Sequence, residues 1–525
     1  MNAPNPHSPC ACCACASGHD HHPLVRLDRR NFLINAGVLT IGGLALTSLD
    51  AGGAAAPAPP RPPRWRKALR VQPVLTYDVP QRREATSWRN WGGVQTEEQA
   101  KAEQERIARE LRQMAAAAEC QLDILPVAAT RKIEEAANIA KGDHDALVIF
   151  AAGGGGKLLE ALTLPEKWNL MFLRHIPGPV YLWYEIVHPR FLRKTVDEYG
   201  QPGFAPEDVV VDRYEALLTR LRALHGLKNT LGKKIICIGG ASGWGKGGAK
   251  APEIAKNLWK LDLVDCPYKE LAPRLERSFA DAALVKRCQE DARRYLKQSG
   301  ITLHTRREFV ERAFVLREAM VDLMDEAKTD AITVNHCMGT IMGISKTTAC
   351  LPLSLMNDDG YLAFCESDFV VIPSGILLHY ICGKPVFLND PTYPHDQVVT
   401  LAHCTAPRKM DGRKAERAKI LTHFESDYGA APKVEMRLGQ VCTNLVPDFA
   451  CKKWVGFAGT IVGNPFLDIC RSQIDVKVNG DALALMQEMK GFHWMMSYGN
   501  YLADCAYALN KLGVELLDVS APKPA

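Results

Sequence analysis

The sequence predicts an α/β protein with two doubly wound, Rossmann-like parallel-sheet domains, followed by a mostly antiparallel β domain with terminal helices. Between residues 69 and 335, short apolar runs alternate with long amphipathic stretches, which is typical of parallel sheets covered by helices. After about Pro385, strand-like runs follow one another with little helix between them. These two patterns divide the chain into residues 69–231, 232–384 and 385–525.

The elements follow the chain in that order. The strands expected in the two parallel sheets are 69–75, 123–127, 146–150, 180–186, 233–239 and 330–335, and the long helices are 97–120, 207–231, 273–298 and 308–328. The strands expected in the last domain are 398–401, 434–438, 441–445, 454–462 and 474–478, with helices over 481–489 and 494–512.

The N-terminal part, residues 1–56, is expected to be an export signal and not part of the fold. Residues 27–33 read L-D-R-R-N-F-L and match the twin-arginine signal. A short apolar stretch and the small-residue run 51–56 follow, so we expect cleavage near Ala55 and a mature, periplasmic or otherwise exported protein. Residues 57–68 are a proline-rich linker.

A cysteine- and histidine-rich tract precedes the signal. It runs from Cys10 to Cys15, with histidines close behind, a composition typical of soft-metal binding. No second ligand pair is spaced to fold a zinc module, so the tract is interpreted as an extension that is removed with the signal.

The composition is ordinary for a large globular protein. The 525 residues are 47% hydrophobic and 23% charged, and the net charge is only +5. Basic residues are dispersed among acids, which argues against a nucleic-acid partner. Of the 17 cysteines, most lie inside apolar segments and are expected to be buried free thiols, not a disulfide framework.

Residues 361–393 carry the strongest functional signal. They read as apolar strand, helix and apolar strand, with Glu366 at the end of the first strand and Asp390 at the end of the second. The connection, 369–382, is about the minimum length for a right-handed crossover, so we expect the two strands to be parallel neighbours. Both carboxylates would then meet at the ligand-binding edge of one sheet. Such a pair suits divalent cations and proton-transfer chemistry.

Two histidines extend this set. His403 ends the next apolar run, and His493 stands just before an expected helix. Either histidine alone is more often a core or surface residue, but with two carboxylates the four form a common mixed ligand set for manganese, iron or zinc.

Several short motifs surround these residues: C-L-P-L-S at 350–354, N-D-D-G at 357–360, C-E-S-D at 365–368, N-D-P at 389–391, H-C at 403–404, and H-W at 493–494 followed by Gly499. In these motifs the chain resembles the L-fucose isomerase and L-arabinose isomerase superfamily. The resemblance covers roughly the last third of the chain, and the middle only by pattern.

The resemblance implies an aldose–ketose isomerase of the pentose or 6-deoxyhexose class with one divalent cation, usually Mn²⁺. It implies Glu366, Asp390 and His493 as metal ligands, with His403 as an additional ligand in the arabinose branch, although the motif around His403 differs. Glu366 is expected to remove the proton next to the carbonyl to give an ene-diol, and Asp390 to be its partner. A homo-oligomer is also expected. Family members are usually cytoplasmic, and the export signal departs from that pattern.

Two other classes of protein stay open from the sequence. An exported, non-catalytic sugar-binding or sensing protein could keep the same fold. An exported oxidoreductase is disfavoured because the glycine clusters at 153–156 and 239–246 lack the G-x-G-x-x-G spacing. Within the second cluster, Trp244 is a candidate for stacking on a sugar.

The twin-arginine interpretation makes a direct prediction, with the twin-arginine translocase as the partner during export. Replacing Arg29 and Arg30 by lysine should leave a folded protein in the cytoplasm with its N-terminal extension intact. Cell fractionation and N-terminal mass analysis measure this. A doubly substituted protein that still reaches the periplasm would show that the signal has been misread.

Overall fold

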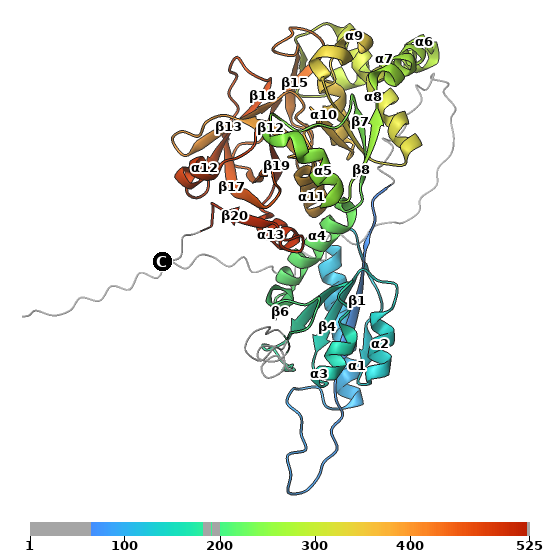
Figure 1. Ribbon diagram of the computed structural model, residues 1–525, viewed down its shortest axis with the longest axis vertical. Helices are drawn as coiled ribbons and strands as arrows, with labels where there is room; N and C mark the ends of the chain where they lie inside the picture. Colours follow the sequence, from blue (N-terminus) through green and yellow to red (C-terminus); the bar gives the residue numbers. More distant parts are fainter. Residues whose placement is uncertain (1–64, 182–190, 192–199, 522–525) are drawn as a thin grey trace, which may run out of the picture. The chain divides into compact units, whose positions relative to one another are not determined.

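The computed structural model describes residues 65–181, 191 and 200–521. These residues form a mixed α/β structure with two parallel sheets, a small third sheet and a closed antiparallel barrel (Figure 1). The α/β class and the two parallel sheets are therefore confirmed. Residues 1–64, which include the twin-arginine motif, the cysteine-rich tract and most of the proline-rich linker, lie outside the described residues.

In the first sheet, β1 is an interior strand with paired strands on both of its sides. Its hydrogen-bonded order is β2-β1-β4-β5-β6, β3 also pairs with β1, and every pairing is parallel. The strands are β1 (Leu69–Thr76), β2 (Leu122–Ile124), β3 (Ala128–Thr130), β4 (Ala146–Ala151), β5 (Trp168–Leu173) and β6 (Val209–Val211).

Helices cover both faces of this sheet because its strands are apolar on both faces. Alternate residues of β4 enter different clusters: Val148 and Phe150 pack with α1 (Glu97–Ala116) and α4 (Tyr214–Thr230), whereas Leu147 and Ile149 pack with α2 (Ile133–Ala140) and α3 (Gly156–Leu162). A period of two along a strand buried on both sides produces this division.

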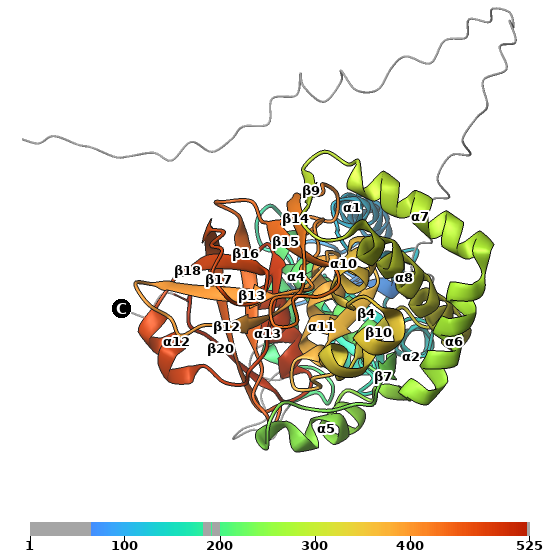
Figure 2. The same cartoon turned by 90° about the horizontal axis from the view of Figure 1, so that it is seen from above.

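The second sheet is also parallel, in the order β11-β10-β7-β8. Its strands are β7 (Lys234–Ile238), β8 (Asp262–Cys266), β10 (Ala331–Val334) and β11 (Leu362–Cys365). The helices of this region are α5 (Ala251–Asn257), α6 (Tyr268–Ala280), α7 (Ala282–Leu296), α8 (Arg307–Ala327), α9 (Met342–Ser345), α10 (Cys350–Asp358) and α11 (Ile372–Cys382). Helix α8 lies between α7 and β10 (Figure 2).

The C-terminal region closes into a six-stranded antiparallel barrel in the order β16-β19-β12-β13-β18-β17, with β17 returning to β16. Its strands are β12 (Phe387–Pro391), β13 (Val398–His403), β16 (Val441–Val446), β17 (Lys453–Gly463), β18 (Ser472–Val478) and β19 (Trp494–Tyr498). Strand β20 (Glu515–Asp518) adds to β17 in parallel, and α12 (Ala482–Glu488) and α13 (Leu502–Asn510) complete the region. The third sheet joins β9 (Ile301–Leu303), β14 (Arg417–Leu421) and β15 (Ala431–Glu435).

The expected pairing of the strands carrying Glu366 and Asp390 is wrong. Strand β11 belongs to the second parallel sheet, whereas β12 pairs antiparallel with β13 and β19 in the barrel. A crossover of sufficient length permits parallel neighbours but does not require them. The hydrogen bonds of β12 are instead satisfied partly by β19, a segment about a hundred residues further along the chain.

Three expected helices also differ. The helix expected at 494–512 is strand β19 followed by α13, the helix expected at 207–231 begins only at Tyr214 after strand β6, and the helix expected at 273–298 is interrupted. Asp281 causes that interruption because its side chain caps a new helix, accepting hydrogen bonds from the backbone N–H groups of Ala283 and Leu284. The strand expected at 180–186 falls mostly outside the described residues.

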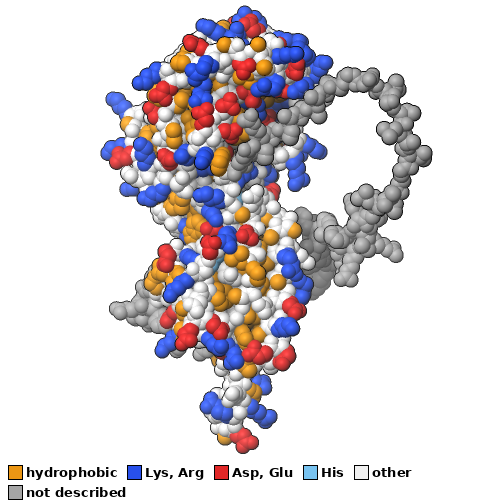
Figure 3. All heavy atoms as spheres, turned by 90° about the vertical axis from the view of Figure 1, so that its right-hand side faces the viewer, with side chains coloured by type: hydrophobic (Ala, Val, Ile, Leu, Met, Phe, Trp, Pro, Cys, Tyr) orange, Lys and Arg blue, Asp and Glu red, His pale blue; other side chains and the backbone are white. Residues whose placement is uncertain are grey.

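The thirteen cysteines of the described part of the chain are all free, and most are buried, as the sequence predicts. Among the described residues, none of the helices is both long and apolar enough to cross a membrane. On the face drawn in Figure 3, acidic and basic side chains are interspersed.

Candidate metal centre

A group of ionisable side chains gathers where the second parallel sheet meets the barrel. Glu366 follows β11 directly, Asp390 lies in β12, His403 ends β13, and His493 precedes β19. In the barrel, β12 lies between β13 and β19. Asp390, His403 and His493 therefore lie on or next to three neighbouring strands. Segments separated by more than a hundred residues therefore contribute to one site.

The turn after β11 has an unusual backbone. Glu366 and Ser367 both have positive φ, 66° and 49°, a conformation that L-residues adopt only when the surroundings enforce it. The Ser367 N–H donates to Thr333 Oγ1 at 3.1 Å, and the Ser242 N–H donates to the Ser367 carbonyl at 3.1 Å. These bonds hold a turn that brings Glu366 and Asp368 to the same histidine.

His493 is the common neighbour of three carboxylates. Its Nε2 lies 3.2 Å from Glu366 Oε2 and 3.2 Å from Asp390 Oδ1, and its Nδ1 lies 2.7 Å from Asp368 Oδ2. His403 Nε2 lies 3.7 Å from Glu366 Oε1. The four residues expected as ligands are therefore brought together, with Glu366 and Asp390 on the same side of the His493 ring.

The second nitrogen of each histidine is occupied. Asp368 can only accept when ionised, so Nδ1 of His493 carries a hydrogen and donates it. His403 Nδ1 pairs with Thr405 Oγ1 at 3.1 Å. When the rings are neutral, this arrangement leaves the lone pair of His493 on Nε2. The lone pair of His403 is also on Nε2 when Thr405 accepts the hydrogen bond from Nδ1. Histidines that bind metals are usually oriented in this way by a second partner.

Three buried atoms at the centre have no hydrogen-bond partner among the described residues: Asp390 Oδ1, His403 Nε2 and His493 Nε2. Their donor atoms lie within 4.8 Å of one another, and a second group of the same kind is formed by Cys365, Glu366 and His403. Leaving three polar atoms buried and unpaired is costly, and one bound cation would satisfy them together. The donor set fits a divalent cation, and its chemistry does not identify the metal.

Electrostatics tie the carboxylates and histidines to one another. Burial raises the pKa of Glu366, but the adjacent imidazoles of His403 and His493 outweigh it and hold the pKa well below its usual value. Burial raises the pKa of Asp390. Burial lowers the pKa of each histidine, but the carboxylates overcome it and raise the pKa of His403 to about 9 and that of His493 to about 10. Acids and imidazoles therefore stabilise each other's charged forms here.

The histidines of the centre are buried, whereas its carboxylates are partly exposed to solvent. The His403 and His493 side chains are 4% and 1% exposed, whereas those of Glu366 and Asp390 are 37% and 26% exposed. A ligand would therefore reach the carboxylates first. Trp244 stacks obliquely on Phe492, the residue before His493, with ring centroids 4.4 Å apart, so this candidate stacking residue lies next to the centre.

Two partners were missed from the sequence. Asp368 orients His493, and Thr405 pairs with His403. Each lies two residues after an expected ligand, and that spacing is the only local signal. For Asp368, the two-residue spacing brings the side chain to His493 only because the backbone turns through left-handed conformations at 366–367.

No protein-family model matches the sequence, and a search of characterised proteins finds no relative.

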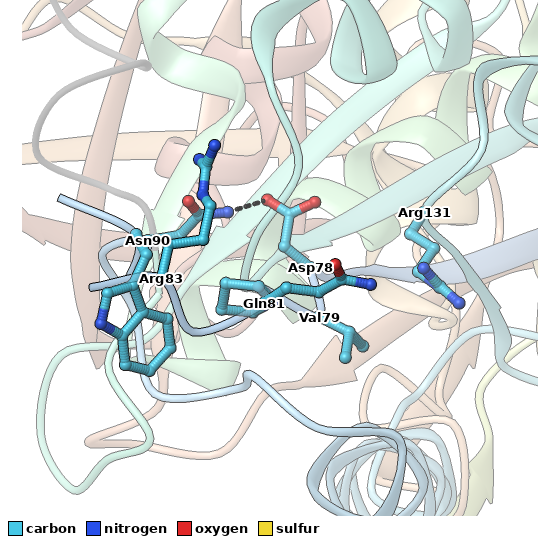
Figure 4. A pocket seen from close by; sticks show the side chains of 8 residues that line it. Asp78, Val79, Gln81, Arg83, Asn90 and Arg131 are labelled. Carbon is cyan, nitrogen blue, oxygen red and sulfur yellow. Dashed lines mark hydrogen bonds between the residues drawn. The ribbon is translucent and has the colours of Figure 1, made fainter. Parts of the chain in front are cut away.

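A polar groove of about 380 Å³ lies elsewhere, beyond the carboxyl ends of β1 and β3 (Figure 4). Asp78 accepts hydrogen bonds from Asn90 Nδ2 at 2.9 Å and from the Gly154 N–H at 2.8 Å. Arg83 and Arg131 lie on opposite sides of Asp78, and Trp88 also lines the groove. None of the four expected site residues lines this groove.

The Asp368–His493 hydrogen bond generates a prediction for metal binding. Replacing Asp368 by Asn keeps an acceptor but removes the charge that orients and strengthens His493. Affinity for Mn²⁺ alone should fall roughly 10- to 100-fold, measured by titration calorimetry.

Asp504→Asn is the matched control. Asp504 is equally buried and pairs with Arg222 at 2.7 Å, away from the centre. Its variant should lose stability but keep the Mn²⁺ affinity. Equal affinities in Asp368→Asn and wild type would contradict the role of Asp368.

Proposed function

We propose that the protein is a divalent-metal-dependent aldose–ketose isomerase acting on pentoses or 6-deoxyhexoses. The observation that supports this most is the convergence of Glu366 and Asp390 on His493 Nε2, at 3.2 Å each, in a centre whose buried donor atoms have no hydrogen-bond partner. Isomerisation moves a proton between two adjacent carbons, and positioned acid–base groups accelerate both its removal and its return.

Glu366, Asp390, His403 and His493 would hold the cation, for which we propose Mn²⁺, the ion that the resemblance implies. A bound cation would orient two adjacent substrate oxygens and polarise the carbonyl. His493, fixed by Asp368, and His403, paired with Thr405, supply the rigid nitrogen side of the ligand set.

The two carboxylates do the proton chemistry in this proposal. Their partly exposed side chains face the open side, so a sugar can contact both without moving the buried histidines. Glu366 takes the proton next to the carbonyl to give an ene-diol, and Asp390 assists its return to the neighbouring carbon. Positioned groups of this kind contribute about 10²- to 10⁴-fold each to the rate. The exposed aromatic pair, Trp244 and Phe492, offers a surface for the apolar face of the sugar.

The resemblance to the fucose and arabinose isomerases is part of this proposal. The C-E-S-D, N-D-P and H-W motifs stand at the turn after β11, in β12 and at the start of β19, where the candidate ligands meet. We further propose that the enzyme is exported by the twin-arginine translocase and works as a homo-oligomer.

A sugar-binding or sensing protein is the second candidate. The groove at Asp78 supports it, because charged groups, amides and an indole are the side chains that recognise sugar hydroxyls and ring faces without needing a metal. Binding of sugars without interconversion, in the presence of Mn²⁺, would favour this alternative.

The isomerase proposal is tested by two substitutions. Glu366→Gln keeps the size and one ligand oxygen but cannot accept the proton, so turnover of aldopentoses and 6-deoxyaldoses should fall by about 10²-fold or more while sugar binding persists. Asp390→Asn should lose metal as well as activity, because a charged ligand becomes neutral.

Glu488→Gln is the control, since Glu488 has a similar side-chain exposure, 36% against 37%, and lies in α12, outside both groups of residues that could hold a metal. It should keep full activity. Unchanged turnover in Glu366→Gln would assign the proton transfer to another group and remove the basis of the mechanism.

A further inference from the structure

Two thiols meet beside the candidate metal centre. Cys365 is the last residue of β11, and Cys337 begins the π-helical turn 337–341 that follows the neighbouring strand β10. Because Val334 pairs with Cys365 across the two strands, the turn passes close to the end of β11. The two sulfur atoms lie 3.4 Å apart.

The two cysteines differ in accessibility. Cys365 is 3% exposed, whereas Cys337 is only partly buried. A more exposed cysteine next to a second thiol that can resolve it is typical of redox-sensitive sites.

Cys365 is also connected to the centre. It directly precedes Glu366, whose backbone already has a positive φ of 66°. Its sulfur lies within 4.8 Å of donor atoms of Glu366 and His403. Changes at Cys365 are therefore transmitted to a turn that tolerates little displacement.

We propose that Cys337 and Cys365 are an oxidation site, which a peroxide converts to a disulfide and which thereby weakens cation binding at Glu366. The coupling to the cation rests on the proposed metal centre, whereas the disulfide itself does not.

The chemistry balances with the peroxide as the two-electron oxidant. The Cys337 sulfur attacks hydrogen peroxide, breaking the O–O bond and giving a sulfenic acid and water. The Cys365 sulfur then attacks the Cys337 sulfur, forming the S–S bond and releasing a second water. A dithiol reductant reverses the reaction.

Oxidation acts on the centre because Cys365 is covalently joined to Glu366 and its sulfur lies in the group that it forms with Glu366 and His403. Forming a bond of about 2.05 Å requires the sulfurs to approach by more than 1 Å, which pulls on the residue before Glu366.

A second set of thiols provides the competing explanation. Cys404, next to His403, is in contact with Cys350 and Cys470. A disulfide there could also disturb the centre, so the test must identify which sulfurs are joined.

The experiment uses the reduced, full-length protein treated with hydrogen peroxide. Remaining thiols are alkylated, and cross-linked peptides are mapped by mass spectrometry. Mn²⁺ affinity is then measured by calorimetry before oxidation, after oxidation and after dithiothreitol. We expect a Cys337–Cys365 cross-link, an affinity about tenfold weaker or more, and recovery on reduction.

Two variants complete the design. Cys337→Ser should keep its Mn²⁺ affinity after peroxide, whereas Cys120→Ser, which removes another partly buried thiol, should behave as wild type. The proposal is overturned if no Cys337–Cys365 cross-link forms, if a cross-link within Cys350, Cys404 and Cys470 carries the loss, or if oxidised Cys337→Ser weakens as wild type does. A cross-link without any change in affinity overturns the coupling. If the reduced wild type binds no Mn²⁺, the proposed function fails, while the peptide map still decides the oxidation site.

Discussion

The contact of His493 with three carboxylates is the interaction on which the site depends. Asp368 fixes one ring nitrogen, and Glu366 and Asp390 approach the other. Two of these acids come from the turn after the parallel sheet and the third from the barrel, so the ring joins the two structures. Burying an imidazole at 1% exposure among carboxylates is unfavourable unless each charge is matched. A cation at Nε2 would complete that matching.

The backbone is adapted to this contact. Glu366 and Ser367 occupy left-handed conformations, which cost of order 1–3 kcal/mol each unless the surroundings hold them. Hydrogen bonds from Ser367 to Thr333 and from Ser242 to Ser367 anchor the turn to strand β10 and to the loop after β7. The same turn follows Cys365, which forms a thiol pair with Cys337. The proposed oxidation of this thiol pair would therefore act on the centre through the turn.

The sequence predicted the identity of the site residues more accurately than the strand pairing that brings them together. The parallel sheets and most barrel strands follow from apolar runs such as 146–150 and 454–462, where burial alone dictates the pattern. The candidate residues Glu366, Asp390, His403 and His493 were recognised from their motifs, yet the expected geometry, two parallel neighbours in one sheet, was wrong. Pairing of β12 with β13 and β19 depends on long-range contacts that leave no local signal. Strand β19 was expected to be helix because Trp494 to Tyr498 are all buried, so no alternation of buried and exposed positions marks them as strand. Asp368 was missed because its role requires a positive φ that neither Glu366 nor Ser367 would predict.

The central claim is that one divalent cation binds between the carboxylates and His493. Diffraction from crystals grown with Mn²⁺, recorded near the manganese absorption edge, measures this directly. We expect one strong anomalous peak with oxygens of Glu366 and Asp390 and Nε2 of His493 at roughly 2.0–2.6 Å. A peak elsewhere in the molecule, or none at this position with manganese in excess, would contradict it.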